Sequence, residues 1–313
     1  MIFRSAVCTS TARLDGKTAL ITGSNTGIGK VAVKDFFERG ARVIMACRNE
    51  DKAKVAADDI KTSCQTKENT GEILIERLDL GSLESIRNCA QKLLEREPKI
   101  DLLVNNAGVM MCPEGKTEDG FETQLGTNYL GHFLLTLLLL PKIRQSSAAR
   151  IVNVSSVAHE RGRIDFDDLN SQKKPYSAYA AYTQSKLANV LFTKELDRRL
   201  KESKIDNINV YSLHPGVIKT ELGRHLQETY GSALMFVWRL FSWAIKTPEQ
   251  GAQTTIYCSV DEKCANESGL YYSDCAVKTP SKAAQNSEDA EKLWVESLKL
   301  VGLPDNYNPF EQQ

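Results

Sequence analysis

The sequence predicts an α/β fold, with a single doubly wound parallel sheet and helices on both faces. Three observations predict it. Short apolar runs alternate with amphipathic helical patterns along most of the 313 residues. A glycine-rich turn joins the first apolar run to the first helical pattern. A hydrophobic content of 42% is enough to bury one large core, and a doubly wound sheet of this length is commonly a single domain.

The first strand, residues 17–22, leads directly into Gly23-Ser-Asn-Thr-Gly27-Ile28-Gly29 and then into an amphipathic helix that runs through Phe37. Glycines let a backbone approach a pyrophosphate closely, and a helix that begins there directs free N–H groups and its positive dipole end at the phosphates. The spacing differs from the G-x-G-x-x-G fingerprint, so the interpretation rests on the strand-to-helix context. The turn is predicted to hold a dinucleotide.

The second strand, residues 42–47, ends at Arg48, where a chain that binds NAD would usually carry an acidic residue for the ribose hydroxyls. An arginine can instead bind a 2′-phosphate through charge-assisted hydrogen bonds worth about 1.5–3 kcal/mol, or roughly ten- to a hundredfold in preference. The sequence therefore favours NADP over NAD. Lys30 either adds positive charge there or is a solvated lysine on the first helical turn.

Further elements follow in the alternating order that a parallel sheet with two helical layers requires. They are predicted over residues 72–77, 83–94, 100–105, 121–140, 150–155, 178–200 and 208–213. The most hydrophobic run, 133–140, is far short of the ~20 residues that span a bilayer. We expect it to be a buried helix end that stops at Pro141.

Tyr182 and Lys186 lie four residues apart in a predicted helix, so they share one helical face. A free tyrosine has a pKa of about 10 and exchanges protons poorly near neutrality. An ammonium on the same face can lower that pKa, and a shift of ~3 units would correspond to ~4 kcal/mol. The pair predicts a tyrosine that acts as a general acid.

With these residues assembled, the chain resembles the short-chain dehydrogenase/reductase superfamily from about Gly16 to about Leu303. The resemblance rests on Thr22-Gly-Ser-Asn-Thr-Gly-Ile-Gly29, Asp79, Asn105-Asn-Ala-Gly108, Asn128, Ser155-Ser156, Tyr182 with Lys186, and Pro215-Gly216 with Thr220. Within the superfamily the chain resembles the retinol dehydrogenases that act mainly as NADPH-dependent retinal reductases. Longer runs carry that closer resemblance, among them Leu130-Gly-His-Phe-Leu-Leu-Thr136 and Ser185-Lys-Leu-Ala-Asn-Val-Leu-Phe192.

The resemblance implies a Rossmann-type fold and a catalytic set of Asn128, Ser156, Tyr182 and Lys186. Tyr182 would donate a proton to the carbonyl oxygen as hydride arrives, and Lys186 would lower the pKa of the tyrosine and bind the nicotinamide ribose. Ser156 would hold the same oxygen, because the second serine of this pair is the catalytic one in similar sequences. Asn128 would hold a water that connects Lys186 to solvent; the alternative is an asparagine that packs within its helix.

The predicted cofactor is NADPH or NADP+. The resemblance adds Asp79 at the adenine, residues 105–108 at the adenine ribose, and Ile218 and Thr220 at the carboxamide end of the nicotinamide. The full cofactor-binding set is Gly23, Asn25, Thr26, Gly27, Ile28, Gly29, Arg48, Asp79, Asn105, Ala107, Gly108, Tyr182, Lys186, Pro215, Gly216, Ile218 and Thr220.

The expected organisation is a short lead over residues 1–15, one catalytic domain over 16–303 and a tail over 304–313. The stretch between Ser156 and Tyr182 is longer than in many superfamily members. A similar insertion is usual in the retinol dehydrogenase group, so we interpret it as a loop over the cleft.

Composition excludes several classes of partner. The formal net charge is zero and the basic residues form no stripe, so we expect no binding to nucleic acid. The eight cysteines form no C-x-x-C pair, and their spacing with the four histidines resembles no metal site. We expect reduced thiols in a cytoplasmic protein, structural histidines and no bound metal.

Residues 1–15 have neither the charged lead nor the apolar core of a signal peptide, and the hydrophobic anchor of many retinol dehydrogenases is not found there. The segment 231–246 is strongly apolar and precedes a helix N-cap at Thr247. We expect 221–247 to form a lid over an apolar substrate tunnel, with 231–246 in the lipid interface of the endoplasmic reticulum or of lipid droplets. The alternative is an ordinary helix that packs on the core or on a dimer partner. Superfamily homodimers often pair through the two long helices that end here near Leu140 and Leu200.

These expectations lead to an NADPH-dependent oxidoreductase that reduces a lipophilic aldehyde, with all-trans-retinal as the expected substrate and retinol as the product. The reverse oxidation is chemically available. Two alternatives stay open. One is a reductase of other lipophilic carbonyls, such as isoprenoid or lipid aldehydes and steroid ketones. The other is an NADP-binding scaffold without turnover, against which the four catalytic residues argue together.

Overall fold

One sheet organises the protein in the computed structural model, which describes residues 5–218, 246–304 and 306–311. Its strands are Thr18–Thr22 (β1), Arg42–Cys47 (β2), Glu72–Arg77 (β3), Leu102–Asn105 (β4), Ala149–Val154 (β5), Ile208–His214 (β6), Leu270–Ser273 (β7) and Ala276–Val277 (β8). The helices are Gly27–Glu38 (α1), Glu50–Ser63 (α2), Leu83–Arg96 (α3), Thr123–Leu125 (α4), Gly131–Ile143 (α5), Ala178–Glu202 (α6), Pro248–Val260 (α8) and Ser287–Leu300 (α9).

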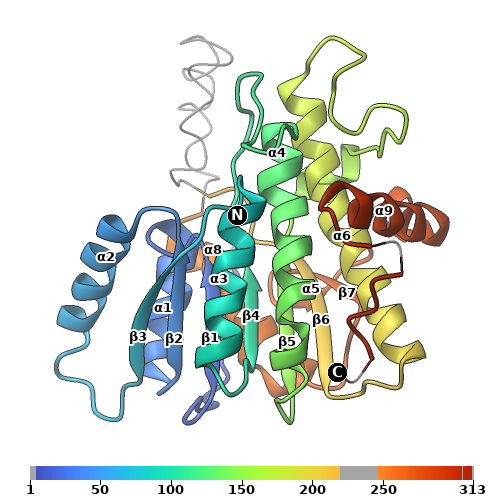
Figure 1. Ribbon diagram of the computed structural model, residues 1–313. Helices are drawn as coiled ribbons and strands as arrows, with labels where there is room; N and C mark the ends of the chain where they lie inside the picture. Colours follow the sequence, from blue (N-terminus) through green and yellow to red (C-terminus); the bar gives the residue numbers. More distant parts are fainter. Residues whose placement is uncertain (1–4, 219–245, 305, 312–313) are drawn as a thin grey trace.

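The strand order is β3-β2-β1-β4-β5-β6-β7-β8 (Figure 1). Neighbouring strands are parallel from β3 to β7, and only the short β8 pairs antiparallel within the described residues. The chain moves outward from β1 to β3 and then crosses back to β4 on the other side of β1. The predicted doubly wound parallel sheet is confirmed, and the reversal between β1 and β4 marks the edge where such sheets bind ligands.

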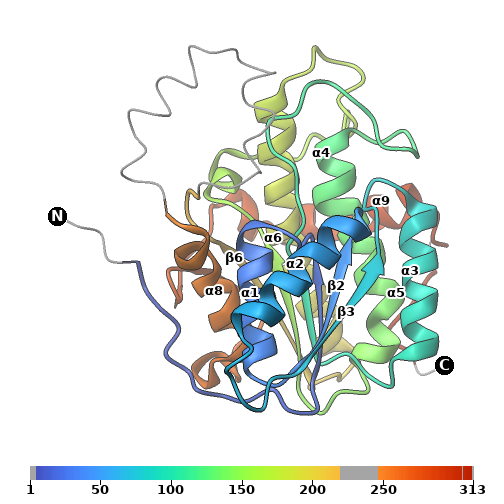
Figure 2. The same cartoon turned by 90° about the vertical axis from the view of Figure 1, so that its left-hand side faces the viewer.

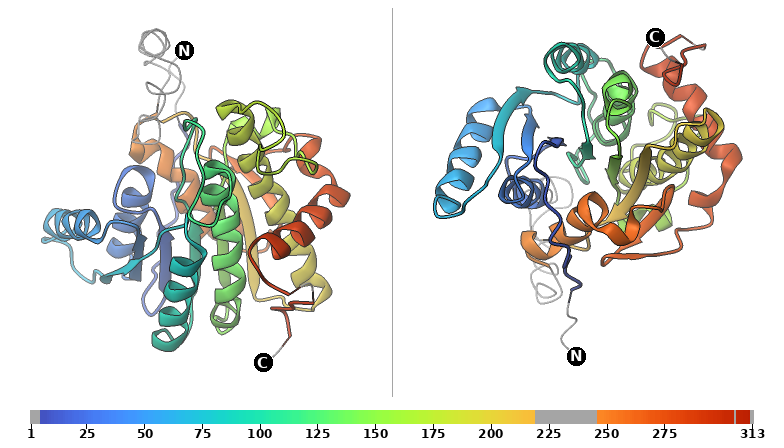
Figure 3. Two further views of the ribbon diagram at one scale, coloured as in Figure 1. Left: turned by 45° about the horizontal axis from the view of Figure 1, so that its top comes forward. Right: turned by 90° about the horizontal axis from the view of Figure 1, so that it is seen from below.

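Helices cover both faces of this sheet. α1, α2 and α8 pack on one face, and α3, α5, α6 and α9 pack on the other (Figure 2). The end-on view shows the strands between the two helical layers (Figure 3, right). Every residue of β1 is buried, with Ala19 and Ile21 in one core and Leu20 in the other. This is why the strand reads as a continuous apolar run and not as an alternating one.

The prediction that the long helix stops at Pro141 is wrong. α5 continues to Ile143, with Pro141 inside it. Proline cannot donate to the carbonyl four residues earlier, that of Leu137. The hydroxyl of Tyr307 lies 3.4 Å from that carbonyl and supplies a donor from the C-terminal segment. Tertiary contacts therefore compensate for the missing backbone bond.

The start of the same helix departs from a regular α-helix. Between α4 and α5 the residues Gly126–Leu130 form a π-helical turn, in which the N–H of Gly131 bonds to the carbonyl of Gly126. Turns of this kind occur often at functional sites. Asn128 lies within this one.

α9 packs against α6 (Figure 1). Trp294 is 2% exposed, its ring lies 5.1 Å from that of Phe133, and the Arg199 guanidinium lies 4.6 Å from the Trp294 ring. Phe310 stacks on Trp294 from the C-terminal segment, at 6.1 Å. A homodimer that paired through this surface of α6 would have to displace α9.

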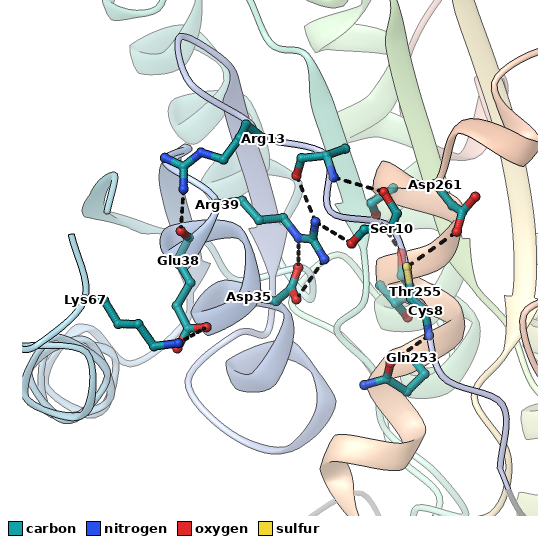
Figure 4. Close-up of polar contacts among 12 residues, drawn as sticks. Cys8, Ser10, Arg13, Asp35, Glu38, Arg39, Lys67, Gln253, Thr255 and Asp261 are labelled. Atoms are coloured by element: carbon teal, nitrogen blue, oxygen red, sulfur yellow. Dashed lines mark hydrogen bonds and ion pairs between the residues drawn. The ribbon is translucent and has the colours of Figure 1, made fainter. Parts of the chain in front are cut away.

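The N-terminal segment is attached to α1 and α8 (Figure 4). The Arg39 guanidinium donates to the carbonyls of Ser10 and Ala12 at 3.0 and 2.8 Å, while Asp35 holds the same guanidinium. The Cys8 N–H donates to Gln253 on α8 at 3.0 Å. The lead therefore packs against the face of the sheet that α1 and α8 cover.

Thr220 and residues 221–245 of the predicted lid, with most of the segment expected to meet lipid, lie outside the described residues. On either side, Ile218 pairs with Lys246 in an isolated parallel bridge. Thr247 then caps α8 in a capping box with Gln250, as predicted. Among the helices that the structure describes, none has both the length and the apolar character needed to cross a bilayer.

Candidate active site

The glycine turn lies between β1 and α1, packed against the end of β4. Gly23 and Gly27 have φ values of 61° and 56°, a region that favours glycine. A Cβ on Gly23 would lie 2.7 Å from the Cα of Ala107, and a Cβ on Gly29 would lie 2.6 Å from Asn106 Nδ2. Both glycines therefore allow a close approach that a side chain would prevent.

The first turn of α1 is suited to an anion. Its N-cap residue, Thr26, makes no side-chain capping hydrogen bond, and the first turn carries no acidic residue. Free N–H groups at a helix start attract phosphate through hydrogen bonding and the helix dipole. Together with the close-packed glycines, this fits the predicted dinucleotide cradle.

The two asparagines of the Asn105-Asn-Ala-Gly108 segment have different hydrogen-bond partners. Asn105 is 2% exposed, and its amide nitrogen donates to Thr136 and Asn153 at 2.9 and 2.8 Å. Its side chain therefore faces the core, and the lining of the adenine ribose by residues 105–108 stays a prediction. Asn106, which was not in the predicted set, donates to the carbonyls of Thr22 and Gly23 at 2.8 and 3.1 Å. The predicted segment 105–108 contains it, although the set of cofactor-binding residues did not name it.

Arg48 and Asp79 lie at the ends of neighbouring strands. The side chain of Arg48 is 71% exposed, and its Nε lies 4.0 Å from Asp79 Oδ2. Asp79 also accepts a hydrogen bond from the N–H of Gly81 at 2.9 Å. Lys30 pairs instead with Asp59 of α2. The Arg48 guanidinium is thus an accessible cation at the carboxyl end of β2.

Tyr182 and Lys186 share one face of α6, as predicted, and Lys186 Nζ lies 5.9 Å from the centroid of the Tyr182 ring. They are 4% and 3% exposed. The Lys186 ammonium donates to the carbonyl of Val154, at the end of β5, at 3.1 Å. The pair is therefore fixed to the carboxyl edge of the sheet.

The predicted lowering of the tyrosine pKa is wrong for this arrangement. Burial raises the pKa of Tyr182 to about 12, although a hydrogen bond with Ser156 acts in the opposite direction. Burial also lowers the pKa of Lys186 to about 8. Removing water disfavours the charged form of each group. Tyr182 is consequently protonated at neutral pH, the form that a proton donor requires.

The two serines after β5 have different partners. Ser155 is 2% exposed, and its hydroxyl donates to the carbonyl of Lys186 at 2.6 Å. Ser156 is partly exposed, accepts the N–H of Ala158 at 3.2 Å, and is hydrogen-bonded to Tyr182. The second serine is therefore the one beside the phenol.

Asn128 is buried, and its side chain is fully hydrogen-bonded. Its amide nitrogen donates to the Val109 carbonyl at 2.9 Å and to the Ser185 hydroxyl at 3.0 Å, and its oxygen accepts the Val109 N–H at 2.8 Å. A Cβ on Gly108 would lie 3.2 Å from Asn128 Oδ1 and 3.6 Å from Lys186 Nζ, so these three residues meet. The side chain therefore connects its π-helical turn to the Val109 backbone and to α6, and the role in holding a water stays a prediction.

The loop after β6 completes the edge. Gly216 has φ +93°, and its N–H donates to His214 at 3.1 Å. A Cβ on Gly251 would clash with Ile218 and lie 2.9 Å from Ile28. Ile218 thus lies beside the glycine turn, next to Pro215 and Gly216, while Thr220 lies outside the described residues.

Comparisons with known proteins agree with this geometry. A family model described as short chain dehydrogenase matches residues 17–231. Retinol dehydrogenase 11 of Homo sapiens is 49% identical over 300 residues, which are 96% of this chain and 90% of that protein. A solved structure of a putative uncharacterized protein from Mycobacterium Paratuberculosis superposes with a TM-score of 0.74 at 33% identity, over 95% of this chain and 97% of that one.

A second solved structure, the Pseudomonas aeruginosa RhlG/NADP active-site complex, has a TM-score of 0.63 at 26% identity, over 83% of this chain and 94% of that one. The matched family and the glycine cradle together indicate a nicotinamide cofactor. The chain belongs to the short-chain dehydrogenase/reductase family of oxidoreductases and is of the retinol dehydrogenase type.

Proposed function

We propose that this protein is an NADPH-dependent reductase of lipophilic aldehydes, with all-trans-retinal as its substrate and retinol as its product. The observation that carries the proposal is a buried, protonated Tyr182 held beside Ser156 at the carboxyl edge of the sheet. Reduction requires a protonated donor, because the carbonyl oxygen must gain a proton. The reverse oxidation uses the same residues.

The bound dinucleotide would supply the hydride. The protein's own residues bind the substrate and supply the proton. The Ser156 hydroxyl binds the carbonyl oxygen, and the Tyr182 phenol delivers its proton to that oxygen as negative charge develops there. Lys186, held by Val154, is the residue from which the phenol's proton is resupplied, and Asn128 fixes the loop at Val109 beside it. Gly23 to Gly29 and the α1 N-terminus would hold the pyrophosphate.

Arg48 supports the choice of NADPH. Its side chain projects into solvent at the end of β2, where a 2′-phosphate would add a stronger partner than the Asp79 carboxylate 4.0 Å away. No acidic residue replaces it at that strand end.

Exposed apolar side chains support a lipophilic substrate. Val157 follows Ser156, Tyr179 lies one helical turn before Tyr182, and Val217 follows Gly216; they are 39%, 45% and 48% exposed. Large apolar groups exposed around a catalytic edge are typical of a site for an apolar ligand. The similarity to retinol dehydrogenase 11 favours retinal among such ligands. Exposed valines select hydrophobicity and not a particular skeleton, so other lipophilic carbonyls are the second candidate.

The test is NADPH oxidation by the purified protein with all-trans-retinal, farnesal, a medium-chain aldehyde and a steroid ketone. NADH serves as the control cofactor. We expect the highest kcat/KM with retinal and NADPH. Activity on the other carbonyls alone would discard the substrate and keep the reaction, whereas dinucleotide binding without any turnover would support the scaffold alternative.

The lid and its lipid contact also belong to this proposal. Replacing Trp238 and Trp243 with serine should weaken binding to liposomes and raise KM for retinal more than for a small aldehyde. Equal changes in KM for both substrates would argue against a lid.

A further inference from the structure

His132 is a buried histidine that the proposed reaction does not use. It lies in the first turn of α5 and is 2% exposed. Both ring nitrogens have partners: Nε2 lies 2.8 Å from the hydroxyl of Thr22, and Nδ1 lies 3.0 Å from the carbonyl oxygen of Asn128. The ring therefore connects the end of β1 to the π-helical turn.

The partners fix which nitrogen carries the proton. A carbonyl oxygen can only accept, so Nδ1 donates to Asn128. Burial lowers the pKa of His132 to about 4, and the ring is neutral at pH 7 with an unprotonated Nε2. The Thr22 hydroxyl then donates to Nε2, since its other acceptor, the Val104 carbonyl, is more distant at 3.5 Å.

The chain of hydrogen bonds extends to β4. The Thr22 oxygen accepts the N–H groups of Asn106 and Ala107, each at 2.9 Å. Ala107 is the residue against which Gly23 packs. The bonds thus run in one direction, from the end of β4 through Thr22 and His132 to the backbone of Asn128.

We infer that His132 is a positioning residue that holds the glycine turn, the end of β4 and the Asn128 turn in one arrangement for the dinucleotide and for Lys186. The inference deepens the proposed function. The expected effect of His132 on catalysis rests on that function. The ring is the direct link between β1 and the π-helical turn, which carries the Asn128 side chain that binds Val109. A histidine that only filled the core would stabilise the fold without coupling these segments.

The experiment compares four variants of the full-length protein. His132→Phe keeps the ring size and removes both bonds, whereas His132→Asn keeps a donor near the Asn128 carbonyl and loses the bond to Thr22. Thr22→Ser keeps the hydroxyl as a conservative rescue. Tyr129→Phe is the matched control, because it removes a buried hydrogen bond of 2.7 Å from the same turn, to Ser297 on α9.

Two readouts separate positioning from stability. In the absence of dinucleotide, hydrogen–deuterium exchange should rise in His132→Phe both at residues 104–109 and at 126–132. Tyr129→Phe should raise it at 126–132 alone. With substrates, His132→Phe should raise the Kd for NADPH and lower kcat by about tenfold each, the scale of losing a buried hydrogen bond. His132→Asn should be intermediate, and Thr22→Ser close to wild type.

Unchanged exchange at 104–109 in His132→Phe would overturn the inference. So would an effect on Kd and kcat that Tyr129→Phe reproduces at equal loss of thermal stability. The exchange readout needs no turnover, so a wild-type protein that reduces none of the carbonyls would contradict the proposed function and leave the coupling of these segments measurable. If His132→Phe does not fold, His132→Asn provides the same comparison.

Discussion

The two ends of the candidate site differ in how the protein holds them. At the outer strands, Arg48 is 71% exposed and its only described ion pair is a 4.0 Å contact with Asp79. At the inner end, beside the carboxyl ends of β4 and β5, the helical residues Asn128, Tyr182 and Lys186 are 0%, 4% and 3% exposed. Asn128 and Lys186 are hydrogen-bonded to backbone groups. Both ends lie at the carboxyl edge of one sheet. The difference indicates that a substitution can change cofactor selection at little cost to stability, whereas the catalytic residues are part of the core.

Burial also sets the chemistry of the inner end. It raises the pKa of Tyr182 and lowers that of Lys186, because the absence of water disfavours the charged form of each group. At the outer end, water surrounds the guanidinium, and its interactions with anions are partly screened. Substitutions at the two ends should therefore separate effects on the chemical step from effects on cofactor selection.

The largest expected effect belongs to Tyr182→Phe. Removing the proton donor should lower kcat at least a thousandfold, within the range of general acid catalysis, while the Kd for NADPH changes less than about threefold. Stopped-flow reduction and fluorescence titration measure the two quantities. Turnover near the wild-type rate would show that another group supplies the proton.

Lys186→Met tests burial at the inner end through pH. The pKa of Lys186 falls from 10.5 in the unfolded chain to about 8 in the fold, so the unfolded state binds more protons between those values. The free energy of unfolding contributed by this group therefore rises with pH from about 8 to 10.5, and below pH 8 the buried ammonium is a constant cost. Lys186→Met should remove that rise and increase stability at pH 7 by about 2 kcal/mol.

Urea denaturation of both proteins at pH 7 and pH 9.5 measures this effect. Tyr182 does not mask it, because a phenol with a raised pKa reduces stability only above pH 10. The variant should also be nearly inactive. An identical pH dependence in the two proteins would mean that Lys186 is solvated.

Arg48→Asp tests the outer end. The change should shift the ratio of kcat/KM for NADPH over NADH by roughly ten- to a hundredfold toward NADH, because it removes a phosphate partner and adds a negative charge. The melting temperature should stay within about 2 °C of wild type, since the side chain is exposed. An unchanged cofactor ratio would show that another group reads the 2′-phosphate.

Lys30→Gln should have the smallest effect. The Lys30 ammonium is already paired with Asp59 on α2, at the surface. We expect less than about 0.5 kcal/mol in stability and less than about twofold in kcat/KM for NADPH. A larger loss with NADPH than with NADH would place Lys30 beside Arg48 as a second phosphate ligand.

The elements with strong local patterns were predictable from sequence. β2 and β3 have the predicted bounds, and α1 begins within the glycine turn as its strand-to-helix context required. α2, α9 and the short strands after α8 were not predicted. The end of α5 was predicted wrongly because the contact that compensates for Pro141 comes from Tyr307, which lies far along the chain.

The candidate site shows the same limit. Spacing placed Tyr182 and Lys186 on one helical face, but their pKa values depend on burial, which spacing does not contain. The motif Asn105-Asn-Ala-Gly108 did not indicate which asparagine faces the core, because that follows from the orientation of the strand end against α5 and β5. His132 has a role that only the meeting of β1, β4 and the π-helical turn reveals.

The most direct test of the difference between the two ends is single-turnover hydride transfer, measured alongside the Kd for NADPH, in wild type, Tyr182→Phe and Arg48→Asp. The predicted result is a crossed pattern: Arg48→Asp weakens NADPH binding and keeps the rate at saturation, while Tyr182→Phe keeps binding and loses the rate. If both variants changed binding and rate by similar factors, the two ends would act as one unit, and the separation of selection from chemistry would be wrong.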